Sequence, residues 1–354
     1  MRLIRPRLAV RLAVLVMGLG VGLPAAPATA ATQHSTRSRT AAGHHSTATH
    51  KSAYSSRAST ARRARLARAR AVTRARERAR LSALREAMTP HYKLDANGIL
   101  VPDVRAAAAI VFNPATGQVL YEENSQDKRS IASITKVMTA LVFLEDNPDL
   151  NQDITVQRSD VYAASTTHLR ARDELTAGEL LHLLLIASDN AAARALARSS
   201  HGGTAPFVER MNEKALELGL DSTSFADPSG LNPDNVSSAY DLSRLITFAA
   251  SDERISSIMR TPTYTVTTTR RTIPIHSTNH LLLAGDVDVM GGKTGFISKA
   301  GYCLATLLRL PQGNPVAVVV LGARSNMGRF WETRHLFNWL ADKGFDVVSR
   351  QESK

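Results

Sequence analysis

The sequence predicts an α/β (α+β) fold, in which an antiparallel sheet is flanked by helices and carries a helical insert at about residues 145–260. Strand-like apolar runs occur near both ends of the main part of the chain, and helical patterns fill the stretch between them. A domain built in this way closes when its N- and C-terminal strands pair in one sheet. We expect this domain to cover residues 99–345, followed by a C-terminal tail at 346–354.

Local patterns predict the individual elements. Strands are expected at 106–112, 118–121, 263–267, 289–296, 302–310 and 316–322. Helices are expected from Ser133 onward and at 180–187, 191–198, 206–218, 239–250 and 327–340. Turn residues separate the strands, with Asn-Pro at 113–114 and Pro-Gln-Gly-Asn at 311–314. The two long strands around the second turn are expected to form a hairpin.

The first thirty residues have the composition of a secretory signal peptide. Four arginines precede an apolar run at 12–23, and the small-residue triplet Ala28-Thr29-Ala30 follows it. A charged segment, a short apolar segment and an A-x-A cleavage site are the three parts of such a signal. We therefore expect an exported, periplasmic protein, and export excludes nucleic acid as a partner.

Residues 31–98 are expected to form a disordered basic arm rich in Ala and Arg. Residues 1–88 carry 18 Lys and Arg against 2 Asp and Glu, whereas the rest of the chain carries 26 against 29. The positive net charge of the chain, +13, therefore comes from residues 1–88, and the rest of the chain is slightly acidic. Ala and Arg favour helices, so the arm is a candidate to become helical on an anionic surface of the cell envelope. A solvated linker of biased composition is the alternative.

Three short strings carry the chemistry of this chain. They are S-x-x-K beginning at Ser133, S-x-N beginning at Ser188 and K-T-G beginning at Lys293. A serine hydroxyl needs a nearby base, and residues three apart on a helix share a face, so Lys136 can reach Ser133. Lys136 acts as a base only when it is neutral, and burial or a second cation such as Lys293 would favour that state. Ser188 can relay a proton, and Asn190 can hold a substrate amide.

Each string has a less specific interpretation when it stands alone. Ser133 can be a helix cap, with Lys136 as a surface charge, and Asn190 can be a structural cap. Ser125 also begins an S-x-x-K string, but it lies in a polar run expected to be a solvated loop. Ser277 begins a second S-x-N string too close to Lys293 to leave room for a helical domain. The ordered set of three favours the catalytic interpretation.

These residues resemble the D-alanyl-D-alanine peptidases among the low-molecular-mass penicillin-binding proteins. The likeness runs from about Ala106 to Trp339 and includes ASITKVMTA (132–140), ASDNAA (187–192), DPSGL (227–231) and GKTGF (292–296). Together with AGYCL (300–304), the last segment makes the chain most similar to the D,D-endopeptidase (penicillin-binding protein 7) branch. The resemblance implies the serine β-lactamase/D,D-peptidase-like fold. The long basic arm is not part of it.

The resemblance also implies a mechanism. Lys136 would take the proton of Ser133, which would attack a D-Ala carbonyl in a peptidoglycan stem peptide and form an acyl-enzyme. The backbone N–H groups of Ser133 and Phe296 would bind the oxyanion, and Ser188 would pass the proton to the leaving amine. Asn190 and Thr294 would position the substrate, and the assigned substrate-binding residues are Thr294, Gly295 and Phe296. β-Lactams would acylate Ser133.

The mechanism needs no metal and no cofactor. Three functions stay open from the sequence: a D,D-endopeptidase that cuts cross-links, a D-alanyl-D-alanine carboxypeptidase, and a β-lactamase. A fourth reading, a wall-binding protein without activity, conflicts with the intact motifs. A β-lactamase would need a deacylating Glu between the second and third motifs, where the available residues are Glu209, Glu213, Glu217 and Glu253.

Overall fold

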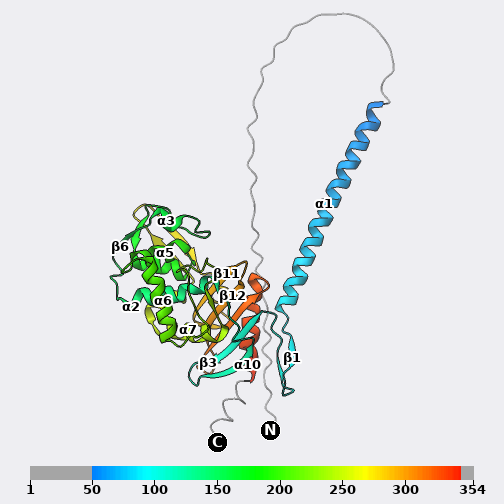
Figure 1. The fold of residues 1–354 in the computed structure, drawn as a ribbon. Helices are drawn as coiled ribbons and strands as arrows, with labels where there is room; N and C mark the ends of the chain where they lie inside the picture. Colours follow the sequence, from blue (N-terminus) through cyan, green and yellow to red (C-terminus); the bar gives the residue numbers. More distant parts are fainter. Residues whose placement is uncertain (1–49, 344–354) are drawn as a thin grey trace, which may run out of the picture. The chain divides into compact units, whose positions relative to one another are not determined.

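A five-stranded antiparallel sheet forms the centre of the predicted main domain (Figure 1). The computed structural model describes residues 50–343, and the strand order in this sheet is β11-β12-β13-β3-β4. Ile110 of β3 lies opposite Val319 of β13, so the first and last strands meet as the sequence predicts. The strands are β3 (Ala108–Asn113), β4 (Gln118–Glu123), β11 (Asp288–Ile297), β12 (Gly301–Arg309) and β13 (Pro315–Ala323).

Both faces of the sheet are covered. Ile110 and Val319 belong to a core shared with α7 (Ala239–Ser251), whereas Val111 and Val318 belong to a second core shared with α10 (Asn326–Lys343). Strands that are buried on both faces need apolar residues at nearly every position. This explains why β3 and β13 are continuous apolar runs in the sequence and do not alternate.

A helical lobe follows the second strand, as the predicted insert requires. Its central helix is α2 (Thr135–Glu145), whose residues from Thr135 to Leu144 are all buried. The other helices of this region are α3 (Arg158–Val161), α4 (Ala177–Leu185), α5 (Asn190–Ser199), α6 (Thr204–Glu217), α8 (Glu253–Met259) and α9 (His280–Ala284). Two-stranded ladders join β6 (Asp153–Thr155) to β7 (Glu174–Thr176), β5 (Arg129–Ser130) to β8 (Val236–Ser237), and β9 (Thr263–Thr267) to β10 (Thr272–His276).

Within the predicted disordered arm at 31–98, the described residues 50–98 form regular elements, and residues 31–49 lie outside the described part of the chain. Helix α1 spans His50–Met88, and a hairpin joins β1 (Tyr92–Leu94) to β2 (Leu100–Pro102). Ala and Arg are among the best helix formers, which accounts for a long helix with no apolar stripe. The chain divides into two units between Ala69 and Arg70, within α1. Inside the second unit, Arg105 donates to Glu86 over 2.5 Å, so the last turn of α1 contacts the domain.

Two of the predicted segments lie outside the described residues: the signal peptide at 1–30 and the tail at 346–354. Among the residues that are described, no helix combines the length and the apolar character needed to cross a membrane.

Candidate active site

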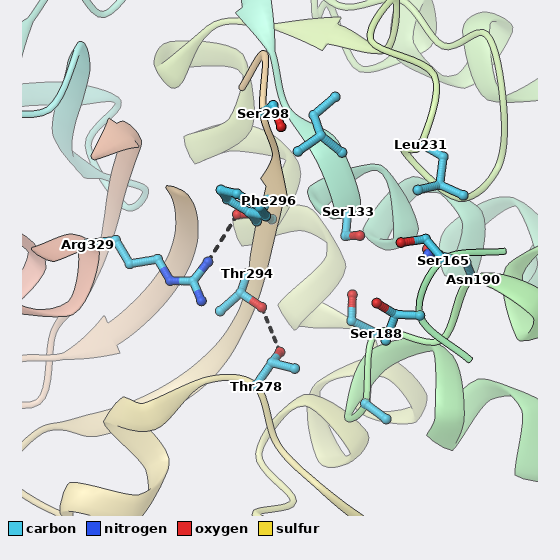
Figure 2. Close-up of a pocket in the computed structure, with 14 residues that line it drawn as sticks. Ser133, Ser165, Ser188, Asn190, Leu231, Thr278, Thr294, Phe296, Ser298 and Arg329 are labelled. Carbon is cyan, nitrogen blue, oxygen red and sulfur yellow. Dashed lines mark hydrogen bonds between the residues drawn. The ribbon is translucent and has the colours of Figure 1, made fainter. Parts of the chain in front are cut away.

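Ser133 lies where the sheet meets the helical lobe, on the wall of a cavity of about 420 Å³ (Figure 2). It belongs to a 3-10 turn, Ala132–Ile134, that leads directly into α2. Ala132, the residue before it, has a φ of +50°, a conformation that costs a non-glycine residue on the order of 1–3 kcal/mol. The strained turn places the serine at the N-terminal end of α2, where the helix dipole favours negative charge.

Lys136 is completely buried and points at Ser133. Its Nζ lies 2.9 Å from Ser133 Oγ, 2.6 Å from Asn190 Oδ1 and 2.5 Å from the carbonyl oxygen of Ser229. The last two atoms can only accept hydrogen bonds. A neutral amine has two N–H groups and one lone pair, so it can donate to both acceptors and still take the Ser133 proton. The three contacts accommodate both forms: the ammonium donates to all three oxygens, and the neutral amine donates to Asn190 and Ser229 and can accept the Ser133 proton.

Burial lowers the pKa of Lys136 from 10.5 to about 7. The carboxylates of Asp189 and Asp227 oppose this shift, and Arg194 adds to it. The sequence left two causes open, burial or a second cation such as Lys293, and burial dominates. Desolvation is the largest cause, and Arg194 is the cation that assists it.

Ser188 occupies the short connection between α4 and α5, with a φ of +60°. Lys293, on β11, donates to Ser188 Oγ over 2.7 Å and to the Thr294 carbonyl over 2.9 Å. The Lys293 side chain is buried, and burial lowers its pKa well below the usual range, with Lys136 and Arg329 contributing in the same direction. The hydrogen bond between Lys293 and Ser188 thus joins the K-T-G motif to the S-x-N motif.

Asn190 has its side-chain amide already engaged. Oδ1 accepts from Lys136, and Nδ2 donates to the Ala164 carbonyl over 2.7 Å. The N-cap of α5 is Asp189, whose carboxylate accepts from two backbone N–H groups of the first turn. Asn190 is therefore not the cap, and its contacts fit positioning of Lys136 better than the expected binding of a substrate amide.

Thr294, Gly295 and Phe296 lie on β11, which is the edge strand of the sheet. A Cβ on Gly295 would stand 2.6 Å from the carbonyl oxygen of Ile131, so only glycine lets this strand approach the turn of Ser133. Thr294 Oγ1 is 2.6 Å from Thr278 Oγ1. The ring of Phe296 is half-exposed. All three residues line the cavity that contains Ser133.

Arg329 is a cavity residue that the motifs did not reveal. It comes from α10 and donates to the carbonyl oxygens of Gly295 and Cys303, at 3.0 and 3.2 Å, and to Asn326. Burial lowers its pKa to about 10. Among the described residues no carboxylate forms an ion pair with Arg329. A lone arginine on an otherwise motif-free helix gives no sequence signal. Other lining residues outside the motifs are Ser165, Thr166, Leu231, Thr278 and Ser298.

Neither rejected motif serine, Ser125 or Ser277, is among the described residues that line this cavity, although Thr278, next to Ser277, is. Ser125 is buried and donates to Glu122 over 2.5 Å, so the expectation of a solvated loop was wrong for this residue. No Asp or Glu is among the described residues that line the cavity. The four glutamates considered for deacylation, Glu209, Glu213, Glu217 and Glu253, are therefore absent from its walls. Within the described part of the chain, no group of His, Cys, Asp and Glu side chains has the arrangement of a metal site.

Comparison with known proteins is consistent with this geometry. The family model Peptidase_S11, D-alanyl-D-alanine carboxypeptidase, matches residues 95–325. A D-alanyl-D-alanine endopeptidase of Escherichia coli (strain K12) is 32% identical over 250 residues, which are 68% of this chain and 78% of that protein. The D-alanyl-D-alanine carboxypeptidase DacF of Bacillus subtilis (strain 168) is 36% identical over 62% of this chain and 57% of its own length.

A solved structure shares the fold. The crystal structure of the Streptomyces K15 DD-transpeptidase superposes with a TM-score of 0.64 at 29% identity, over 68% of this chain and 98% of that one. The expected serine β-lactamase/D,D-peptidase-like architecture is confirmed.

Proposed function

We propose that this chain, which belongs to the Peptidase_S11 family of serine D-alanyl-D-alanine peptidases, acts mainly as a D,D-endopeptidase on peptidoglycan cross-links. The observation that carries the proposal is the position of Lys136 Nζ, 2.9 Å from Ser133 Oγ with its other two partners both acceptors. This arrangement supplies a neutral base to a serine on the wall of an open cavity.

The acylation step follows from these contacts. Lys136 Nζ takes the proton of Ser133, and Oγ bonds to the carbonyl carbon of the D-Ala on the acyl side of the scissile amide. Backbone N–H groups of Ser133 and Phe296 bind the resulting oxyanion, and one such donor typically contributes about 3–4 kcal/mol. When the C–N bond breaks, the leaving amine receives a proton through Ser188, which Lys293 orients. Water then hydrolyses the acyl-enzyme.

The edge strand β11 supports peptide binding beside the nucleophile. An extended substrate can add to an unpaired strand edge by main-chain hydrogen bonds, and side-chain pockets then give specificity. Thr294 and Phe296 lie on this strand at the cavity. A β-lactam presents a similar amide to Ser133, so we propose that these drugs acylate the same residue.

Arg329 fits the leaving group of this reaction. Both a terminal D-Ala and the D-centre of a cross-linked diamino acid carry a carboxylate next to the scissile amide nitrogen. A buried guanidinium without a carboxylate partner is suited to bind that carboxylate. This contact would be common to endopeptidase and carboxypeptidase substrates, so Arg329 does not distinguish the two. The GKTGF and AGYCL segments, and the endopeptidase name of the E. coli relative, favour the endopeptidase.

Digestion of purified muropeptides tests the proposal. We expect the enzyme to convert cross-linked dimers to monomers and the Ser133→Ala variant to leave them intact. Release of free D-Ala from pentapeptide monomers, with dimers unchanged, would assign a carboxypeptidase instead. Fast turnover of a chromogenic cephalosporin would assign a β-lactamase, which the absence of Asp and Glu from the described cavity walls opposes.

We further propose that the protein works in the periplasm and binds an anionic polymer of the envelope through α1. The pattern at residues 1–30 supports export. Between residues 60 and 80, α1 exposes two large apolar side chains, Leu66 and Val72, whose spacing places them on different faces of the helix. A helix with no apolar stripe does not lie stably in a bilayer surface. Its many exposed arginines suit a flexible polyanion that can contact several faces at once.

A further inference from the structure

The loop Asp227–Asn232 lies directly beside the proposed catalytic pair, although the mechanism above assigns it no part. The carbonyl oxygen of Ser229 accepts the 2.5 Å hydrogen bond from Lys136. Gly230 has a φ of +82°, and a Cβ there would stand 2.0 Å from the carbonyl oxygen of Ala132 and 2.9 Å from Ser133 N. The loop therefore packs against the backbone that presents the nucleophile, and only glycine allows that approach.

The carboxylate of Asp227 holds this loop together. Its Oδ1 accepts from the backbone N–H groups of Gly230 and Asn232, at 3.1 and 3.2 Å. Its Oδ2 accepts from Ser229 N at 3.0 Å and from the Ser229 hydroxyl. Both oxygens thus bind groups of a single turn. Without this carboxylate, the peptide unit that carries the Ser229 carbonyl has no other side chain holding its N–H group.

Asn235 ties the loop to the segment of the nucleophile. Its side chain is fully buried, and Oδ1 accepts from Ala226 N and Asp227 N. Its Nδ2 donates to Asp227 Oδ1 at 2.7 Å and to Thr135 Oγ1 at 3.1 Å. The backbone carbonyl of Asn235 accepts from Ile131 N at 3.1 Å. Ile131 and Thr135 flank Ser133, so the loop is held to both sides of it.

We infer that Asp227 is a positioning residue for the general base: it orders the loop that fixes the Ser229 carbonyl on Lys136 Nζ. The inference rests on the proposed function, because it concerns the protonation and aim of the Lys136 amine. With the carbonyl in place, one N–H of the neutral amine is directed at Ser229 and the other at Asn190. The lone pair of the Lys136 amine is then directed at the Ser133 hydroxyl.

The charge of Asp227 acts on the same amine. The charged groups that act on Lys136 are Asp189 and Asp227, which raise its pKa, and Arg194, which lowers it. Lys293 donates to Ser188, and its own pKa is lowered in part by Lys136. Removing the Asp227 charge lowers the pKa of Lys136. Losing the Ser229 acceptor acts in the same direction, because a hydrogen bond to a carbonyl favours the protonated amine. Because the lost charge alone shifts this pKa, the loss of the Ser229 contact is detected by the plateau rate and by a variant that keeps the Asp227 charge.

The test compares Asp227→Asn with Asp234→Asn, which removes the same charge from an exposed side chain nearby. The second-order rate of acylation by a fluorescent penicillin is measured from pH 5.5 to 9, together with the melting temperature. In Asp227→Asn we expect the plateau rate to fall by up to about 10²-fold, the loss typical of a misplaced catalytic group. We also expect the midpoint of the pH profile to move to lower pH. Asp234→Asn should match the wild type in both.

Ser229→Ala provides a second variant that keeps the carbonyl and removes the hydroxyl held by Asp227. It should lower the plateau rate less and shift the midpoint in the same direction. If both variants fold and keep the wild-type midpoint, Asp227 has a structural role only and the inference is wrong. That result differs from failure of the proposed function, in which the wild-type protein itself would not be acylated at Ser133.

Discussion

The acylation rate should depend on pH through the titration of Lys136, and this dependence is the most direct test of the base. The pKa of the buried amine falls from 10.5 to about 7. An unperturbed lysine would be neutral in roughly one molecule in 3,000 at pH 7, whereas an amine with this pKa is neutral in about half of them. Burial therefore supplies on the order of 10³-fold more of the reactive form at neutral pH.

The sign of the effect follows from the direction of the shift. Below pH 7 the amine is protonated and cannot take the Ser133 proton, so the rate should fall tenfold for each pH unit. Above pH 7 the rate should level off. The assay is the second-order rate of labelling by a fluorescent penicillin, with Ser133→Ala as the background. A rate that is independent of pH from 5.5 to 9, or one that still rises steeply above pH 9, would refute Lys136 as a neutral base.

Three further outcomes are expected. Lys136→Arg should abolish acylation as completely as Lys136→Ala, because arginine stays protonated in proteins; near-normal labelling would move the base to another residue, such as Ser188. Ser133→Ala should lose all penicillin labelling in mass-mapped digests, whereas Ser125→Ala should keep it; the reverse would identify the wrong serine. Replacing the nine arginines at 62–80 by glutamine should leave hydrolysis of soluble muropeptides unchanged and weaken sedimentation with sacculi at low salt. Equal sedimentation of both proteins would make the arm a plain linker, and stronger loss on anionic vesicles than on sacculi would favour a bilayer.

The parts of the fold that the sequence could predict are those with strong local patterns. The continuous apolar runs of β3 and β13 identified strands buried on both faces, and the three-residue spacing of Ser133 and Lys136 predicted that they share a helix face. Because the three motifs are far apart in the sequence, the catalytic interpretation also predicted a fold that brings all three into one site.

The remaining parts depend on contacts between distant segments, which carry no local signal. Arg329 reaches the cavity from the last helix, and its position follows only from the packing of α10 on the sheet. The contact of Asn190 with Lys136 could not be predicted, because its residue type suits a substrate amide as well as it suits a buried amine. Burial, one of the two causes expected to keep Lys136 neutral, is the larger, and Arg194, which follows Asn190 by one helical turn, adds to it. Helix propensity outweighed compositional bias in the arm.

The site has features that oppose folding, and the contacts around it explain how they are tolerated. Ala132 and Ser188 hold left-handed backbone conformations, and Lys136 and Lys293 are buried without a carboxylate in direct contact. Strained backbone conformations and buried lysines persist only where several independent contacts of the surrounding structure hold them in place. Each part of the domain contributes a hydrogen bond to one of the two lysines. Lys136 donates to Asn190 of the helical lobe and to Ser229 of the Asp227 loop, and Lys293 donates to the Thr294 carbonyl in the sheet. Because burying an ammonium costs far more free energy than burying a hydrogen-bonded neutral amine, the packing that stabilises the domain also favours the unprotonated base.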